Sequence, residues 1–119
     1  MLLKQILLVG AGGAVGSIFR FLASTLIVRS EPFPFPVATF TVNMLGCFCI
    51  GLFSNLIPSS NLRFLLITGF CGGFTTFSTF SIEVLTLIDD NQTLLALVYI
   101  VLSCIIGVLA VWLGMHITK

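Results

Sequence analysis

The hydrophobic residues of this chain fall into four long runs that are separated by short polar segments. No charged side chain lies between Glu31 and Arg63, between Arg63 and Glu83, or between Asp90 and His116. A helix needs roughly 20 apolar residues to cross a bilayer core that is about 30 Å thick. The pattern therefore predicts four membrane-spanning helices, at about residues 3–28, 37–57, 62–88 and 93–117.

The composition agrees with a membrane environment. Of the 119 residues, 58% are hydrophobic and 8% are charged, and the mean hydropathy is +1.22. Soluble domains are much more polar. Four spans leave only short connections, so residues 1–119 are predicted to form a single all-α integral membrane domain.

The first run carries Gly12, Gly16 and Arg20 at four-residue spacing on one helical face. Small residues at this spacing let two helix backbones approach closely in lipid. Lys4 and the apolar residues after it also resemble a signal peptide, but its removal would delete this packing face, so we expect the span to be retained. The glycine-rich run 10–16 follows no strand pattern, which argues against a dinucleotide-binding turn.

The second run contains one strongly polar group near its middle, Asn43, with Thr39 and Gly46 on the same face. An amide in hydrocarbon needs a hydrogen-bond partner, so this face is predicted to look inward. An ordinary hydrogen bond between two helices would be sufficient to explain an amide at this position. A proline-rich turn, Glu31–Pro36, is expected to precede this span at the membrane interface.

The fourth run places Tyr99, Ser103 and Gly107 on one polar or small face. The cysteines all lie in apolar segments, where small packing residues are the ordinary explanation. They are Cys47, Cys49, Cys71 and Cys104.

The third run is interrupted near its middle by an unusual segment, Gly69–Phe80, that is rich in Gly, Thr, Ser and Phe. Adjacent glycines followed by β-branched threonines weaken a helix. A helix break at membrane depth persists only where the freed backbone groups are buried in protein or line a cavity. Such breaks commonly present carbonyl groups to cations and helix N-termini to anions.

If the helix resumes after Thr75, then Phe74, Phe77 and Phe80 lie within about 120° on one side. The hydroxyl groups of Thr75, Thr76, Ser78 and Thr79 occupy the remaining faces. Aromatic ring edges, hydroxyls and amides can solvate an anion without a fixed charge that would trap it. Lipid-facing or core packing for the rings, and hydrogen bonds to the preceding turn for the hydroxyls, are the ordinary alternatives.

The remaining polar residues do not form a catalytic constellation. His116 is alone near the C-terminus, while Glu83 and the Asp89–Asp90 pair lie toward the far end of the third run, so the chain is not predicted to be an enzyme. A small multidrug exporter would need a titratable carboxylate in the membrane, and the first run has none. A membrane scaffold protein would explain the glycines but not the interrupted helix.

Positive charges give no firm orientation. Lys4, Arg63 and Lys119 fall on one side of the membrane, and Arg29 and Arg20 toward the other. This weak bias is expected of a chain that inserts both ways. Four short helices enclose little volume, so we expect an oligomer, and two opposed copies would form an inverted repeat.

Three stretches resemble the Fluc (CrcB) family of fluoride channels, over essentially the whole chain. They are Gly12-x-x-x-Gly16-x-x-x-Arg20-Phe21, Thr41-Val42-Asn43-x-x-Gly46, and the segment Gly69–Phe80. The resemblance implies an antiparallel, dual-topology homodimer with two fluoride pathways in the inner (plasma) membrane. It implies passive export of fluoride, which lowers fluoride toxicity, and no nucleic-acid partner.

The resemblance also assigns roles to single residues. A structural sodium ion would be held by the backbone carbonyls of Gly72 and Thr75, and Arg20 would attract anions near the pore entrance. The family's next polar position on the fourth helix is Gly107 here. The implied fluoride pathway comprises Asn43, Phe77, Ser78, Thr79, Phe80, Tyr99 and Ser103.

Overall fold

The computed structural model describes residues 1–30 and 35–119, with side chains for residues 1–27 and 35–119. The described spans are α1 (Leu2–Ser30), α2 (Val37–Leu56), a third span built from several pieces (Ser60–Asp89), and α6 (Thr93–Ile117). Each is long and apolar enough to cross a membrane. The predicted architecture of four apolar helices is therefore confirmed. Most of the predicted proline-rich turn, residues 31–34, lies outside the described residues.

The third span is discontinuous, as predicted, but the break is narrower than the segment that suggested it. The span begins with α3 (Ser60–Arg63), continues as a π-helix, η1 (Phe64–Cys71), and ends its first half at α4 (Gly72–Phe74). The backbone is then extended at Thr75 and Thr76, before α5 (Phe77–Asp89) begins. The glycines that were expected to weaken the helix lie within helical segments, so the break is at the threonines. β-branched threonine readily adopts extended backbone.

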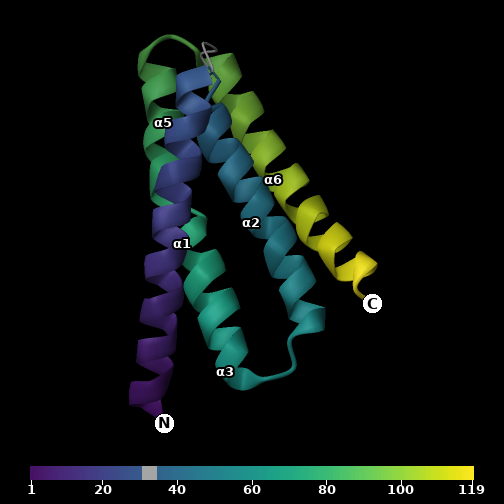
Figure 1. Ribbon diagram of the computed structural model, residues 1–119. Helices are drawn as coiled ribbons and strands as arrows, with labels where there is room; N and C mark the ends of the chain where they lie inside the picture. Colours follow the sequence, from purple (N-terminus) through teal and green to yellow (C-terminus); the bar gives the residue numbers. More distant parts are fainter. Residues whose placement is uncertain (31–34) are drawn as a thin grey trace.

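The four spans run alternately up and down, with the N-terminus, α3 and the C-terminus toward one end (Figure 1). α2 packs most extensively on α6, and α1 packs on η1 and α4, whereas α5 packs on α6. The two halves of the third span therefore have different partners. The break therefore lies between the half of the third span that packs on α1 and the half that packs on α6.

Glycines let α1 and η1 meet backbone to backbone. A Cβ atom at Gly12 would overlap the carbonyl oxygen of Leu65, and one at Gly16 would overlap that of Phe70. On the facing helix, a Cβ atom at Gly73 would lie 2.6 Å from a carbonyl oxygen of α1. These glycines are therefore needed for the close approach that brings α1 against the first half of the third span.

Large apolar side chains cover the outside of the bundle, and few lie wholly inside it. Phe21, Leu94 and Val108 are each more than half exposed, whereas Val42 and Tyr99 are fully buried. An apolar exterior of this extent is stable in lipid rather than in water.

Candidate functional site

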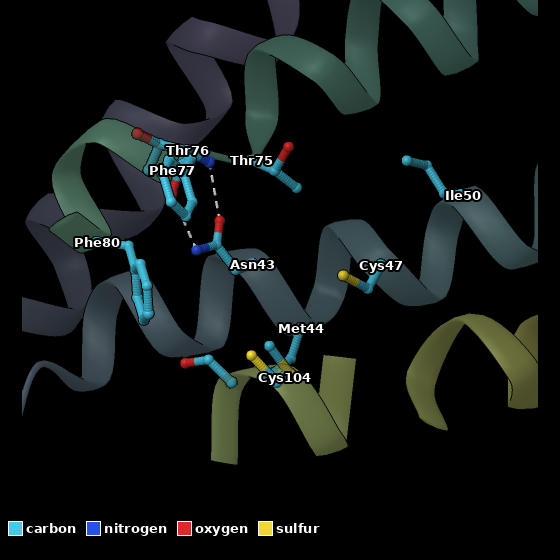
Figure 2. Close-up of a pocket in the computed structure, with 10 residues that line it drawn as sticks. Asn43, Met44, Cys47, Ile50, Thr75, Thr76, Phe77, Phe80 and Cys104 are labelled. Atoms are coloured by element: carbon cyan, nitrogen blue, oxygen red, sulfur yellow. Dashed lines mark hydrogen bonds between the residues drawn. The ribbon is translucent and has the colours of Figure 1, made fainter. Parts of the chain in front are cut away.

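A residue of the second span, α2, forms hydrogen bonds with the break in the third span. The side-chain amide of Asn43 donates from Nδ2 to the carbonyl oxygen of Thr76 at 3.1 Å, and its Oδ1 accepts from the Thr76 N–H at 2.8 Å (Figure 2). The amide thus satisfies both backbone polar groups of one residue in the extended segment. Buried backbone groups without partners are costly, so this pairing stabilises the break.

Thr76 also starts the second half of the span. Its Oγ1 accepts from the backbone N–H of Thr79 at 3.2 Å, the bond of a helix N-cap. The same hydroxyl lies 3.2 Å from the Thr79 hydroxyl and 3.3 Å from that of Ser78. Sequence reasoning named Thr76 only as one of several hydroxyl residues and missed its N-cap role, although a threonine directly before a helical run is a recognisable N-cap signal.

The same hydrogen bonds release two backbone carbonyls. In an uninterrupted α-helix the N–H of Thr76 would donate to the carbonyl of Gly72, and the N–H of Thr79 to that of Thr75. Here the first donates to Asn43 and the second to the Thr76 hydroxyl. The carbonyls of Gly72 and Thr75 therefore lose their usual helical donors.

The carbonyl between these two, at Gly73, has a partner from the first span. Arg20 donates from Nε to the Gly73 oxygen at 3.0 Å. The structure thus places Arg20 beside the break, part-buried, where it joins α1 to α4. A role in attracting anions remains a prediction for this residue.

A pocket of about 300 Å³ lies between α2, the break, α5 and α6. It brings together four of the predicted pathway residues, Asn43, Phe77, Phe80 and Ser103, with Thr75 and Thr76 beside them. Ser78, Thr79 and Tyr99 do not line it.

The two phenylalanines at the start of α5 form a pair, with ring centroids 5.7 Å apart. Phe77 is 78% exposed, whereas Phe80 packs on the Tyr99 ring at 4.8 Å. The expectation that Phe74 shares their face is wrong. Phe74 lies before the break, is buried, and stacks on Phe70 at 5.8 Å. The face was derived from a continuous helical step, which the extended threonines interrupt.

Tyr99 is enclosed and bonded to a carboxyl group. Its hydroxyl donates to Glu83 Oε1 at 2.8 Å, and Thr39 donates to Glu83 Oε2, also at 2.8 Å. Glu83 lies near the middle of α5 and, as expected, toward the far end of the third span (Ser60–Asp89). Because Tyr99 also contacts Phe80, this carboxyl group is linked through Tyr99 to a residue that lines the pocket. Sequence reasoning missed it as a site residue.

The fold and the site together define a class: a multi-pass membrane protein in which a discontinuous helix and its neighbours line an uncharged pocket that includes phenylalanine rings, hydroxyl groups and an amide. Among the described residues, no three His, Cys, Asp or Glu side chains are grouped as a metal site. The chain belongs to the CrcB family of membrane proteins: the family described as "CrcB-like protein, Camphor Resistance (CrcB)" matches residues 7–115.

Curated relatives share nearly the full length of the chain. A protein of Flavobacterium psychrophilum is 43% identical over 98% of both chains, and one of Azobacteroides pseudotrichonymphae is 45% identical over 99% of this chain and 98% of its own. A protein of Methylobacillus flagellatus is 44% identical, covering 97% of this chain and 94% of its own. Each is named "Fluoride-specific ion channel FluC", so these relatives are channels rather than enzymes.

Proposed function

We propose that this protein is a fluoride-selective channel that passively exports fluoride from the cytoplasm and thereby lowers its toxicity. The observation that carries the proposal is the pocket beside the break. There Asn43, Phe77, Phe80 and Ser103 surround one space with no charged side chain among them. The full-length relatives named as fluoride-specific channels support the choice of ion.

The lining suits a small anion that must also leave. Ring edges carry the positive part of the aromatic quadrupole, and amide and hydroxyl groups are neutral donors. Such groups replace hydration without the deep trap that a fixed positive charge would make. Ser78 and Thr79 would extend this surface along α5, and Tyr99 along α6.

The backbone of the break is suited to a structural sodium ion. The carbonyls of Gly72 and Thr75 have lost their helical donors, and carbonyl oxygens are ligands that hard cations prefer. The Thr75 hydroxyl donates to the Cys71 carbonyl at 2.9 Å, so it is the backbone of this residue that is free to bind. A bound sodium ion would neutralise the partial negative charge that these carbonyls gather.

Sodium binding predicts a sodium-dependent stability. A ligand at 100 times its Kd adds about 2.7 kcal/mol to the free energy of unfolding. Thermal unfolding in detergent should therefore occur at a higher temperature in sodium chloride than in N-methylglucamine chloride of equal ionic strength. Thr75→Val, which keeps the carbonyl, should retain this difference. Identical unfolding in the two salts would contradict the sodium assignment.

An antiparallel homodimer with two pathways would complete the site. Gly72 is exposed, and nothing lies within 4 Å of the position a Cβ atom would take there, so the break opens on the surface of a single chain. Phe77, which directly follows the break as the first residue of α5, is also exposed. A second copy in inverted orientation would cover both and add its own carbonyls. The positive charges on the two sides of the membrane, among them Lys4, Arg63 and Arg29, differ little in number, which allows either orientation in the inner membrane.

The direct test is ion efflux from liposomes that contain the purified protein. We expect fluoride to leave rapidly when a potassium ionophore removes the opposing voltage, and chloride to be retained. Efflux should persist without a proton gradient. Equal release of both anions, or absence of fluoride release, would defeat the proposal, and dependence on a proton gradient would instead favour coupled export through Glu83.

A further inference from the structure

One wall of the pocket is rich in sulfur. Met44 and Cys47 reach it from α2, and Cys104 reaches it from α6 (Figure 2). Both cysteines are free thiols; Cys47 is half-buried and Cys104 is exposed. Two thiols and a thioether from two different helices therefore border the same space. Neither the proposed anion pathway nor the sodium site uses any of these atoms.

Gly107 on α6 lies beside two of these sulfur-bearing side chains. A Cβ atom built at Gly107 would lie 3.5 Å from Met44 Cε and 3.6 Å from Cys47 Sγ. The ends of the Met44 and Cys47 side chains therefore both lie against α6 at Gly107. Cys104 lies one helical turn before Gly107 and on nearly the same face. The packing of α2 on α6 therefore brings three sulfur-bearing side chains to the border of one pocket.

The donor set selects a particular class of ion. Thiolate and thioether sulfur favour soft cations, whereas sodium, magnesium and calcium favour oxygen. No third cysteine, histidine or carboxylate joins these two thiols among the described residues, so a tetrahedral zinc site is not available. Soft monovalent d¹⁰ cations accept two or three sulfur ligands, which fits the groups present. Each thiol that binds the metal gives up its proton to water.

We propose that Met44, Cys47 and Cys104 bind a soft monovalent d¹⁰ cation, Cu⁺ or Ag⁺, and that the bound ion obstructs the pocket. The claim that the ion binds rests only on the three sulfur-bearing side chains that line the pocket. The obstruction part rests on the proposed function, because the same pocket contains Asn43, Phe77 and Phe80. The ion would lie between α2 and α6 and fix two walls of the pathway to each other.

Binding is tested with Ag⁺ on the purified full-length protein in detergent. The buffer is sodium gluconate, because chloride precipitates silver. Metal retained after equilibrium dialysis is counted by mass spectrometry. We expect Cys47→Ser and Cys104→Ser each to weaken binding by more than about tenfold, since loss of a ligand exceeds loss of an outer-shell partner. Met44→Leu should weaken it less, and Cys49→Ser, which does not line the pocket, should bind as the wild type does.

Obstruction is tested by fluoride efflux from liposomes with and without Ag⁺, each variant being compared with itself. The wild type and Cys49→Ser should lose most of their efflux at silver concentrations that fill the site, and the Cys47→Ser/Cys104→Ser variant should not. Unchanged silver binding in that double variant would overturn the site. Binding without an effect on efflux would overturn the obstruction. If no variant releases fluoride even without silver, the proposed function fails, and the dialysis result still decides the site.

Discussion

The side chain of Asn43 pairs with both backbone polar groups of Thr76, through hydrogen bonds of 2.8 and 3.1 Å. An amide side chain has the same donor and acceptor as a peptide group, so it supplies what a neighbouring turn of helix would have supplied. The second span therefore determines that the third can be interrupted at this residue. The same amide lines the pocket, which joins the stability of the break to the proposed pathway.

Asn43→Ala should destabilise the protein markedly. Two backbone groups of Thr76 would lose their partner in an apolar setting, which costs about 2–4 kcal/mol in total. The matched control is Asn55→Ala, since Asn55 makes one bond, to the Met115 carbonyl, and is exposed. That variant should lose less than about 1.5 kcal/mol. Denaturant unfolding in micelles measures both, and equal losses would contradict the role of Asn43.

Alanine substitutions along α1 should separate two kinds of glycine. Gly12→Ala and Gly16→Ala would drive a methyl group into the backbone of η1, so neither variant should reach the wild-type unfolding temperature. Gly10 has nothing within 4 Å of its Cβ position. Gly10→Ala should therefore be neutral or stabilising by up to about 1 kcal/mol, the difference in helix propensity. Similar unfolding temperatures for all three would show that the close approach of α1 and η1 is not needed.

Phe77→Ile and Phe80→Ile should reduce fluoride efflux without preventing folding. Phe77 is mostly exposed, so its replacement removes little packing, and Phe80→Ile loses the ring contacts with Tyr99 and Phe77 but keeps a large apolar side chain. We expect each to slow efflux by more than about tenfold, which corresponds to about 1.4 kcal/mol. Phe21→Ile, on the outer face of α1 and 67% exposed, is the control. Wild-type efflux in both pocket variants would show that these rings do not contact the passing ion.

Glu83 and Tyr99 should be energetically coupled. Tyr99→Phe leaves Glu83 Oε1 without its donor, and Glu83→Gln weakens the same bond, so each should cost about 1–3 kcal/mol. The double variant should cost less than the sum of the two. A double-mutant cycle of unfolding free energies measures the difference, and additivity within about 0.5 kcal/mol would argue that the bond contributes nothing.

The spans of this fold could be predicted from sequence because the bilayer thickness sets the length of each apolar run. Details that depend on contacts between helices could not. The exact break at Thr75 and Thr76 depends on a hydrogen-bond partner in α2, and no local pattern identifies that partner. The hydrogen bonds of Glu83 could not be predicted either, because its partners, Thr39 and Tyr99, come from α2 and α6.

The same reason explains where the candidate site was incompletely predicted. Asn43, Phe77, Phe80 and Ser103 stood out because polar or aromatic residues interrupt an apolar background, and the fold brings all four to one pocket. Helical periodicity places Phe74 on the face of Phe77 and Phe80 only if the helix is continuous, and the extended backbone at Thr75 and Thr76 breaks that periodicity.

The groups that stabilise the break have one thing in common, which is their position in the sequence. Arg20 and Asn43, together with the glycines that seat η1 on α1, all precede the break along the chain. Because a protein is synthesised from its N-terminus, these partners emerge from the ribosome before the third span does. The residues that stabilise the interrupted segment have thus already been synthesised when this segment enters the bilayer. Only the wall contributed by α6, with Ser103, is added afterwards, so the pocket is completed last during biogenesis.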